Sequence, residues 1–267
     1  MGIDYITFLK NKSKDNLDSL SIIPNQLINN FYYSKSGDTL NIREEFNIHA
    51  FLEDSQINVY TNLKKQFLEN YHLKIQSIEF NELLRNKTGT STLPKIIDKN
   101  NFRNDDLSGI YGLLSAPIRI GSYENIILQV INGLMGRFPY SRLIRRIRNE
   151  ENLAYYVKSK IYNYHGIIVI TIYSNFFDKV TELLIDEIDN LKSIEEEELA
   201  LVKKSLIHHF SKAQDYPISE VNLKDQYFIT NPNYYYNYKQ IIESISIEDV
   251  KSMLNHLNLD AIYRIKE

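Results

Sequence analysis

The chain contains no cysteine at all. This absence excludes a disulfide framework, a zinc site built on thiolates and a thiol nucleophile, and it leaves the redox compartment unconstrained. No run of the sequence reaches the ~20 apolar residues of a membrane span. The first residues, MGIDYITFLKNKSKDN, lack the apolar core of a signal peptide. A soluble cytoplasmic protein is therefore expected.

The chain also has no excess of positive charge. Lys and Arg number 31 against 34 Asp and Glu, which gives a formal net charge of -3. A chain with this balance has no global attraction to nucleic acid or to anionic lipid. Its apolar fraction of 43% and its charged fraction of 24% are ordinary for a globular protein.

A chain of 267 residues is long enough for one large domain or two small ones. A turn-like SKSGD at residues 34–38 separates short apolar clusters from a more regular remainder. We predict an N-terminal extension, or the remnant of a preceding domain, over residues 1–45. A single domain is predicted over residues 46–267.

Hydrophobic patterning predicts both strands and helices in the larger domain. Short apolar runs typical of strands occur at residues 46–53, 109–116, 155–162, 167–173 and 261–265. Apolar residues at helical spacing occur at residues 57–71, 122–134, 178–191, 193–210 and 246–257. The polar stretch 86–106 and the proline-containing stretch 215–238 predict loops, the second around a short helix. Hairpin strands followed by helices indicate an α+β fold, with a largely antiparallel sheet and helices packed on one face.

Two of the predicted helices begin with a capping-box pattern. Ser193 precedes Glu196 by three residues, and Ser246 precedes Asp249 by three residues. In such a box each side chain accepts a hydrogen bond from the other residue's backbone N–H. We expect this arrangement at both helix starts.

The most informative stretch is INGLMGRFPYSRLIRRIRNEENLAYYVKS, residues 131–159. Gly133 and Gly136 permit backbone angles that other residues avoid. Ser141 can cap the short helix that follows. Arg148 lies in the last turn of that helix, where a cation complements the helix dipole. A strand-like alternation then follows.

Within this stretch, SRLIRRIRNEENLAYYV resembles a segment of the pitrilysin-type (inverzincin) zinc metallopeptidases. The family's segment is S-R-L, then R-E-x-x-x-L-A-Y, after a glycine-rich loop, and it belongs to the second domain type, which carries no zinc. The matching positions here are Ser141, Arg142, Leu143, Arg148, Leu153, Ala154 and Tyr155. Asn149 stands in place of the usual glutamate, and the loop has fewer glycines than usual. The order of elements after residue 46 is also similar to a single domain of this family.

The resemblance implies a role for two side chains of this stretch. In the family, the second domain type faces the zinc domain across a cavity and lends it an arginine and a tyrosine, here Arg148 and Tyr155. A tyrosine hydroxyl can donate to the oxyanion of a tetrahedral intermediate, and an arginine can orient substrate or stabilise charge. The substrate-binding loop would comprise Gly133, Gly136, Ser141 and Arg142. Without the resemblance, the simpler interpretation is that Arg148 complements a helix dipole and Tyr155 packs against the sheet.

The zinc motif of the family's catalytic domain type, H-x-x-E-H, does not occur in the sequence. His49 has Leu52 three positions on, where the motif requires glutamate. His208 and His209 are adjacent, so on a helix they point about 100° apart and cannot both bind one ion in the usual way. We predict no metal site and no metallopeptidase activity on this chain alone, with the zinc carried by a partner.

A cluster of arginines suggests a different function, a phosphate-binding patch. The cluster consists of Arg137, Arg142, Arg145, Arg146 and Arg148. Interleaved tyrosines such as Tyr140 and Tyr156 could stack bases. Against this, Glu150 and Glu151 follow directly, the net charge is negative and no nucleic-acid fold motif is present. A solvated helix face with ion pairs is the simpler prediction.

The sequence therefore predicts the zinc-free half of a pitrilysin-type metallopeptidase. Such a chain would form a heterodimer with a chain that bears H-x-x-E-H. It would bind peptide at an exposed strand edge and contribute Arg148 and Tyr155 to proteolysis. The alternative, from a different class of protein, is a noncatalytic scaffold or assembly subunit with the same fold. Nothing in the sequence selects the substrate.

Overall fold

The computed structural model describes residues 24, 27, 28, 31, 93–100, 108–116, 118, 122–162, 166–228 and 231–266. The strand predicted at residues 46–53, the helix predicted at residues 57–71 and the domain boundary near residue 45 lie outside these ranges and stay predictions. Within the described ranges, no helix combines the length and the apolar character needed to cross a membrane.

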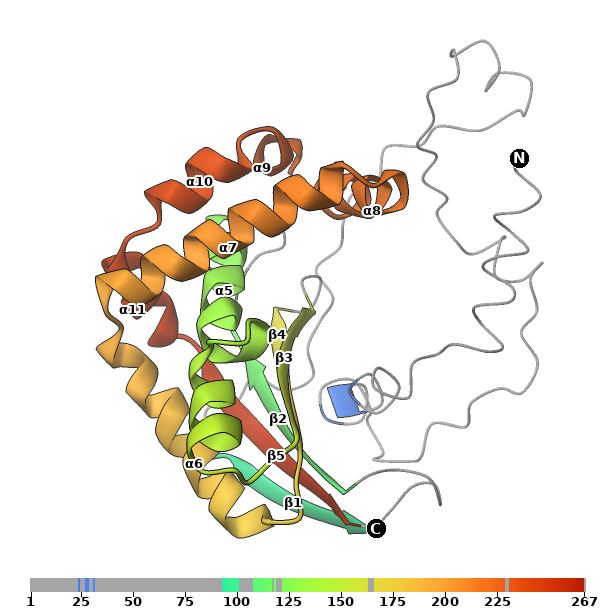
Figure 1. Cartoon of the computed structure of the whole chain (residues 1–267), viewed down its shortest axis with the longest axis vertical. Helices are drawn as coiled ribbons and strands as arrows, with labels where there is room; N and C mark the ends of the chain where they lie inside the picture. Colours follow the sequence, from blue (N-terminus) through green and yellow to red (C-terminus); the bar gives the residue numbers. More distant parts are fainter. Residues whose placement is uncertain are drawn as a thin grey trace, which may run out of the picture.

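A five-stranded sheet forms the centre of the described part of the chain (Figure 1). In spatial order its strands are β1 (Lys95–Asn100), β5 (Asn258–Lys266), β2 (Gly109–Ser115), β4 (Ile167–Tyr173) and β3 (Tyr156–Tyr162). All neighbours are antiparallel except β1 and β5, which run parallel. The predicted α+β fold with a largely antiparallel sheet is confirmed. The predicted hairpin is the β3–β4 pair, and β3 lies at one edge of the sheet.

Strand β1 corrects the prediction that residues 86–106 form a loop. β1 lies at one edge of the described sheet, and Lys95, Ile96 and Asp98 are exposed, so the local sequence lacks the apolar run that marks a buried strand. Its only strand partner in the described sheet is β5, more than a hundred residues later in the chain. Arg264 of β5 reinforces the pairing, because its Nε and Nη2 donate to the two carboxylate oxygens of Asp98 at 2.6 and 2.7 Å.

Seven helices that follow β2 in the chain cover one face of this sheet. They are α5 (Tyr123–Asn132), α6 (Phe177–Asn190), α7 (Glu196–Gln214), α8 (Pro217–Phe228), α9 (Pro232–Tyr236), α10 (Tyr238–Ser244) and α11 (Ile247–Leu254). In Figure 1, α5, α6, α7 and α11 lie together on the same side of the strands, as predicted. Two short segments, Gly133–Arg137 and Ile144–Glu150, wind as wider π-helical turns, a geometry frequent at functional sites.

The stretch 215–238 is more helical than the predicted loops around one short helix. Pro217 and Pro232 do not break helices here, because each begins one. Proline is well tolerated in the first turn, where its missing N–H would have no helical partner. Asn231 caps α9 in addition, with its Oδ1 accepting from the Asn233 backbone N–H at 3.1 Å.

Apolar side chains are buried on both faces of the sheet. Leu128 and Ile170 belong to the large cluster under the helices, and Val169 and Tyr263 belong to a second cluster on the opposite face. The described residues of the predicted N-terminal extension that join the second cluster are Leu27, Ile28 and Phe31. The Phe31 ring meets Tyr263 edge-on, with the ring centroids 6.5 Å apart. Part of the second face is therefore covered by the beginning of the chain.

The capping box predicted at Ser193 and Glu196 is wrong. Helix α7 begins after Glu195, whose side chain makes no capping hydrogen bond. Ser193 lies instead in the 3-10 turn Leu191–Ser193, and its Oγ donates to the Asn190 carbonyl at 2.7 Å. This serine therefore stabilises the turn between α6 and α7 and not the start of α7.

The capping box predicted at the start of α11 is confirmed. Ser246 Oγ accepts from the Asp249 backbone N–H at 3.1 Å, and Asp249 Oδ2 accepts from the Ser246 backbone N–H at 2.8 Å. The hydrogen bond from the Ser246 backbone is the largest of the effects that hold the pKa of Asp249 below its usual value. Because such a cap typically contributes about 1 kcal/mol, this box helps to fix where α11 begins.

We expect Asp249→Asn to reduce the acid sensitivity of the fold. A carboxylate with a lowered folded-state pKa stabilises the protein above its unfolded-state pKa, and this contribution is lost as the pH falls through the folded-state value. In the unmodified chain, this loss is expected below about pH 4. Urea unfolding between about pH 7 and pH 3 should show a shallower acid-side fall in the free energy of unfolding for the variant. Parallel curves for the two proteins would contradict the prediction.

Candidate functional site

The central stretch leaves α5 through a tight loop that is held together from within. The buried Ser141 Oγ accepts from the Phe138 backbone N–H at 2.9 Å and donates to the Gly133 carbonyl at 2.6 Å. The Ser141 carbonyl accepts from the Arg145 N–H at 2.9 Å. The Ser141 side chain therefore fastens the loop behind it and does not cap the following helix as predicted.

Gly133 and Gly136 are buried, and each is required by a close neighbour. A Cβ on Gly133 would lie 2.5 Å from Val202 Cγ1 of α7, and a Cβ on Gly136 would lie 3.0 Å from the backbone nitrogen of Ser159 in β3. The φ angle of Gly136 is -162°, an extended value that any residue adopts, so space and not backbone freedom selects glycine. Ser159 Oγ also donates to the Asn132 carbonyl at 3.0 Å. The loop therefore packs directly against the backbone of β3 at Ser159.

We expect Gly133→Ala to destabilise the fold by about 1–3 kcal/mol, because the added methyl overlaps Val202 in a packed core. Gly133 has helical angles (φ -61, ψ -42), so the intrinsic preference of alanine for helix would act in the opposite direction by about 1 kcal/mol. The matched control is Gly133→Ala combined with Val202→Ala. Urea unfolding of the double variant should show a smaller loss than the sum of the two single variants. An additive result would mean that the two sites do not clash.

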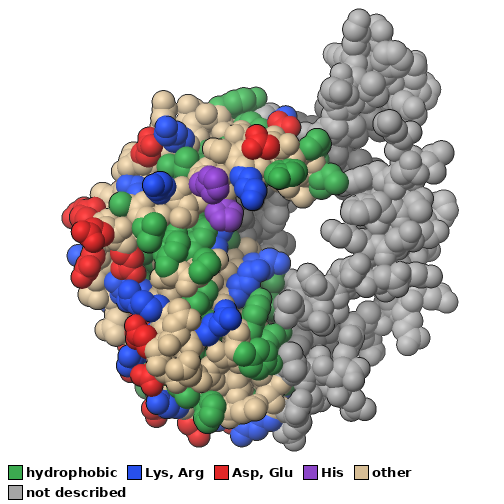
Figure 2. Space-filling model, in the orientation of Figure 1, with side chains coloured by type: hydrophobic (Ala, Val, Ile, Leu, Met, Phe, Trp, Pro, Cys, Tyr) green, Lys and Arg blue, Asp and Glu red, His purple; other side chains and the backbone are tan. Residues whose placement is uncertain are grey.

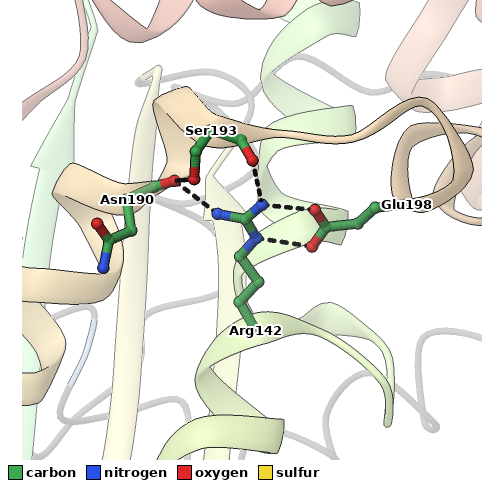
Figure 3. A network of polar contacts seen from close by, with 4 residues as sticks. All are labelled: Arg142, Asn190, Ser193 and Glu198. Atoms are coloured by element: carbon green, nitrogen blue, oxygen red, sulfur yellow. Dashed lines mark hydrogen bonds and ion pairs between the residues drawn. The ribbon is translucent and has the colours of Figure 1, made fainter.

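Arg142 is buried, and its guanidinium group forms hydrogen bonds inside the protein (Figure 3). Its Nε and Nη2 donate to the two carboxylate oxygens of Glu198, a residue of α7, at 2.7 and 2.6 Å. Its Nη1 donates to the Asn190 carbonyl at 2.6 Å, and Nη2 also donates to the Ser193 carbonyl at 3.0 Å. All three nitrogen atoms are therefore engaged between α6 and α7. These contacts favour a structural role for Arg142 over the substrate contact expected from the sequence.

Arg148 and Tyr155 lie at the two ends of the return from the second π-helical turn to β3. The backbone N–H of Leu153 donates to the Ile147 carbonyl at 3.0 Å, which folds the return back onto the helix. Asn152 takes a left-handed φ of 54°, a conformation that asparagine tolerates better than most residues. The return is therefore a fixed turn, and its two ends have defined positions.

Both of these side chains are exposed. The Arg148 side chain makes no ion pair or hydrogen bond with any residue of the described part of the chain. Tyr155 is 59% exposed, and its ring is tilted against Tyr173 of β4 with the centroids 5.9 Å apart. The Tyr155 ring thus packs against the sheet, while more than half of the residue's surface is exposed. Tyr155 directly precedes β3, and Arg148 lies in the π-helical turn before it.

The other arginines of the segment do not form a free phosphate-binding patch. Arg145 pairs with Glu150 at 3.6 Å, and Arg146 pairs with Glu150 and with Glu151, each at 3.2 Å. Glu151 also accepts from Lys179 at 3.0 Å, the contact that does most to hold the pKa of Glu151 below its usual value. The predicted solvated helix face with ion pairs is present.

A cavity of about 510 Å³ lies beside β3 and was not predicted from the sequence. It is bounded by α5, the π-helical turn Gly133–Arg137, β3, α7, α8 and α10. Lys158 and Lys160 of β3 and Arg137 of the turn line it, together with the buried Asn132. Its walls come from segments far apart in the sequence. Only the i, i+2 spacing of the two lysines on a strand hinted at a shared location.

The floor of this cavity is polar but electrically neutral. Gln129 is buried, with Nε2 3.1 Å from the Tyr227 hydroxyl and Oε1 accepting from the Tyr238 hydroxyl at 3.2 Å. Burial raises the pKa of Tyr227 to about 12 and raises the pKa of Tyr238 well above its usual value, so both phenols stay protonated. Burial, and then the nearby charge of Arg137, lowers the pKa of His209. The described residues of this floor therefore favour their uncharged forms.

The described part of the chain offers no set of residues that fits a catalytic zinc. Within the described ranges, no group of three or more His, Cys, Asp or Glu side chains is placed to hold a metal ion. His208 and His209 are exposed neighbours on α7, with ring centroids 6.1 Å apart and ring planes at 80°. This divergent pair and the missing H-x-x-E-H do not supply the family's ligand set.

Known proteins resemble this chain in sequence and in fold. A family model described as the Peptidase M16 inactive domain matches residues 64–206. The Bacillus subtilis (strain 168) protein named probable inactive metalloprotease YmfF is 26% identical over 154 residues, which is 52% of this chain and 34% of that protein. This chain therefore spans about a third of that curated relative.

Two solved structures share the fold at low sequence identity. A protease from Helicobacter pylori has a TM-score of 0.62 and 12% identity, over 77% of this chain and 54% of that chain. A peptidase M16 inactive domain from Pseudomonas fluorescens has a TM-score of 0.53 and 19% identity, over 64% of this chain and 43% of that chain. At these identities the likeness concerns the fold alone. Each solved chain extends well beyond the part that is matched.

Proposed function

The chain belongs to the pitrilysin-type (M16) metallopeptidase family, as a domain of the inactive, zinc-free type, and from this premise we propose that it is one half of a two-part zinc peptidase. It pairs with a chain that bears H-x-x-E-H, binds peptide between the two halves and lends Arg148 and Tyr155 to cleavage. The observation that carries the proposal is the exposure of these two side chains on a fixed turn at one end of an edge strand. A cytoplasmic location stays a prediction from the sequence.

The support beneath these two side chains is rigid, which suits a role in trans. The backbone bond between Leu153 and Ile147 fixes the turn, and Ser174 Oγ donates to the Leu153 carbonyl at 2.5 Å from the end of β4. Groups that act in catalysis must be held in place by the residues around them. A flexible loop would lose this advantage, because ordering it on assembly costs conformational entropy.

The proposed roles follow from the chemistry of the two groups. The Tyr155 hydroxyl donates a hydrogen bond to the peptide oxygen that becomes negative as the carbonyl carbon turns tetrahedral. Arg148 orients a carbonyl or carboxylate of the substrate with a charged hydrogen bond. The partner supplies the metal, whose chemistry in such enzymes is to lower the pKa of a bound water. This chain alone therefore binds and orients peptide and does not cleave it.

The edge of β3 supports peptide binding. Within the described part of the chain, the backbone of residues 157–161 pairs with β4 and makes no backbone hydrogen bond to another element. An extended peptide can add to such an edge as a further strand, through main-chain hydrogen bonds that tolerate many sequences. Tyr155 directly precedes this edge, so an added strand would run past the proposed oxyanion donor.

A noncatalytic scaffold or assembly subunit is the second candidate. The name of the Bacillus subtilis relative, probable inactive metalloprotease, favours it. In this case the chain would use the same fold to bind its partner, and the hydroxyl of Tyr155 would have no chemical task. The two candidates therefore differ in what the assembled complex does and not in whether it assembles.

The test is to purify the full chain from its native source with any H-x-x-E-H-bearing chain that accompanies it, and to measure zinc content and peptide cleavage for each chain and for the mixture. We expect this chain alone to be zinc-free and inactive, and to raise the partner's activity at least tenfold. Assembly without any gain in turnover would support the scaffold. Stoichiometric zinc and cleavage by this chain alone would overturn the proposal.

A further inference from the structure

We infer that the peptide bound at the edge of β3 is acidic, with carboxylate side chains at two alternating positions that face Lys158 and Lys160. This inference rests on the proposed function, because it names the charge pattern of the peptide that the half binds. The two lysines lie on the face of the sheet that carries the second apolar cluster, opposite the helices. The alternation of side chains along β3 gives them this position.

Alternate side chains of β3 point to opposite faces of the sheet. Val157 and Ile161 pack in the large cluster under the helices, and Ser159 Oγ donates to the Asn132 carbonyl at the end of α5. The remaining side chains of the strand therefore point away from the helices and form a stripe on the other face. The members of this β3 stripe are Tyr156, Lys158, Lys160 and Tyr162.

The two tyrosines at the ends of the β3 stripe are held in place by the sheet. Tyr156 stacks on Tyr173 of β4, with the ring centroids 5.0 Å apart. The Tyr162 hydroxyl is buried, and both tyrosines pack against the second apolar cluster. The stripe therefore has fixed ends, and the two lysines occupy the positions between them.

The two lysines carry positive charge that no acidic side chain of the described part neutralises. Both are exposed, and neither makes an ion pair with a residue in those ranges. Their partners in β4 are neutral, since Thr171 lies opposite Lys158 and Val169 opposite Lys160. The Lys160 Nζ lies over the Tyr162 ring, 5.1 Å from its centroid. An ammonium placed over a ring keeps N–H groups that can donate to a carboxylate.

The lack of acidic neighbours is specific to this side of the sheet. Neither β3 nor β4 contains an Asp or a Glu. Toward the other side of the sheet, Arg264 of β5 pairs with Asp98 of β1 and with Asp178 of α6, each at 2.6 Å. Figure 2 shows lysine and arginine side chains beside hydrophobic ones on the face of the molecule that includes β3. An acidic ligand would supply the counter-charges that β3 and β4 lack.

An added strand would place its own side chains beside the β3 stripe. In the described sheet β3 pairs only with β4, so a peptide would add on its other side. Opposite residues of neighbouring strands share a face, and alternate residues lie about 7 Å apart along a strand. Acidic side chains at positions i and i+2 of the peptide would therefore face Lys158 and Lys160. Acidic side chains at i and i+1 would point to opposite faces, and only one of them would meet a lysine.

The experiment measures binding of four fluorescent peptides to the full chain by anisotropy at low salt. All four have blocked ends and one shared sequence rich in Thr and Val, and they differ only at three central positions. The alternating peptide has Glu-Val-Glu there, the adjacent peptide Glu-Glu-Val, the neutral peptide Gln-Val-Gln and the basic peptide Lys-Val-Lys. The alternating and adjacent peptides thus have the same composition and the same net charge.

We expect the alternating peptide to bind about twofold to fivefold tighter than the adjacent peptide, the effect of one charged cross-strand pair. It should bind about fourfold to twentyfold tighter than the neutral peptide, because two such pairs are then absent. The basic peptide should bind most weakly, since like charges on opposite residues repel.

A charge exchange tests whether the peptide contacts these two lysines. The double variant Lys158→Glu with Lys160→Glu is expected to reverse the order, so that the basic peptide binds tighter than the alternating peptide. The matched control is Lys204→Glu with Lys251→Glu, which changes the net charge equally at exposed lysines of α7 and α11. The control should keep the order of the unmodified chain. All four positions lie on the surface, and urea unfolding of both double variants checks that the fold is preserved.

The possible failures separate the inference from the function beneath it. Equal binding of the alternating and adjacent peptides, or reversal of the order in the control variant, would show general charge attraction and overturn the inference while peptide binding stands. Equal binding of the alternating and neutral peptides would do the same. Failure of all four peptides to bind would contradict the proposed function as well. A single-stranded oligonucleotide that binds tighter than the alternating peptide would contradict both, because the ligand would then be a nucleic acid.

Discussion

Tyr155→Phe is expected to lower the turnover number of the assembled peptidase by about 100-fold to 1000-fold, the usual effect of removing one oxyanion donor. The substitution removes only the hydroxyl. The ring keeps its contact with Tyr173, and the residue is 59% exposed, so the stability of the chain and its assembly should not change. Steady-state kinetics of the complex, with sedimentation to confirm assembly, measures this directly. The loss should appear in kcat, because the bond is strongest in the transition state.

The neighbouring tyrosine gives a matched control for this result. Tyr156, the first residue of β3, also contacts Tyr173: the two rings stack with their centroids 5.0 Å apart. Tyr156→Phe should leave turnover unchanged. Arg148→Ala, set against Arg145→Ala, extends the test to the proposed substrate-orienting group. Unchanged turnover in both Tyr155→Phe and Arg148→Ala would assign the chain to the scaffold class.

The elements that could be predicted from the sequence are those with a local cause. The β3–β4 hairpin, the apolar stripe of α5 and the cap at Ser246 are each specified by residues close together in the chain. β1 has no such signal, because its pairing partner β5 lies at the far end of the sequence. The prolines of α8 and α9 led to a wrong prediction for a different reason. Proline breaks a helix when it lies in the interior, but it is favoured in the first turn, and the sequence alone did not distinguish the two positions.

The candidate site divides in the same way. The segment around Arg148 and Tyr155 was found because its spacing resembles a family pattern, but that pattern does not report exposure. Arg142 belongs to the same pattern and is buried, whereas Arg148, six residues later, lies in solvent. The cavity beside β3 could not be predicted, because α5, α7, α8 and β3 meet there only in the folded chain. A cavity that forms through folding leaves no local trace in the sequence.

The buried position of Arg142 leads to the largest expected effect on stability. Arg142 bridges the end of α6 and the start of α7. It donates to the carbonyls of Asn190 and Ser193, before α7, and forms two hydrogen bonds with the carboxylate of Glu198 in the first turn of α7. Carbonyls at a helix end lack helical partners and need such donors. Removing one member of a buried pair typically costs 3–5 kcal/mol, because the other charge is left without a partner.

Arg142→Ala should therefore lower the free energy of unfolding by about 2–4 kcal/mol, a range reduced because the Glu198 side chain is 22% exposed and water can partly replace the lost partner. Arg142→Lys should recover only part of this, since an ammonium cannot form the two parallel bonds of the guanidinium. Urea unfolding of Arg142→Ala, Glu198→Ala and the double variant should give a coupling energy of about 1–3 kcal/mol. Arg146→Ala, which breaks only exposed pairs, should cost less than about 1 kcal/mol.

If Arg142→Ala costs no more than Arg146→Ala, the bridge between α6 and α7 is not what holds the loop before β3 in place. Turnover by the complex should then be insensitive to Arg142, whereas a positioning role predicts that Arg142→Lys lowers kcat while the chain remains folded.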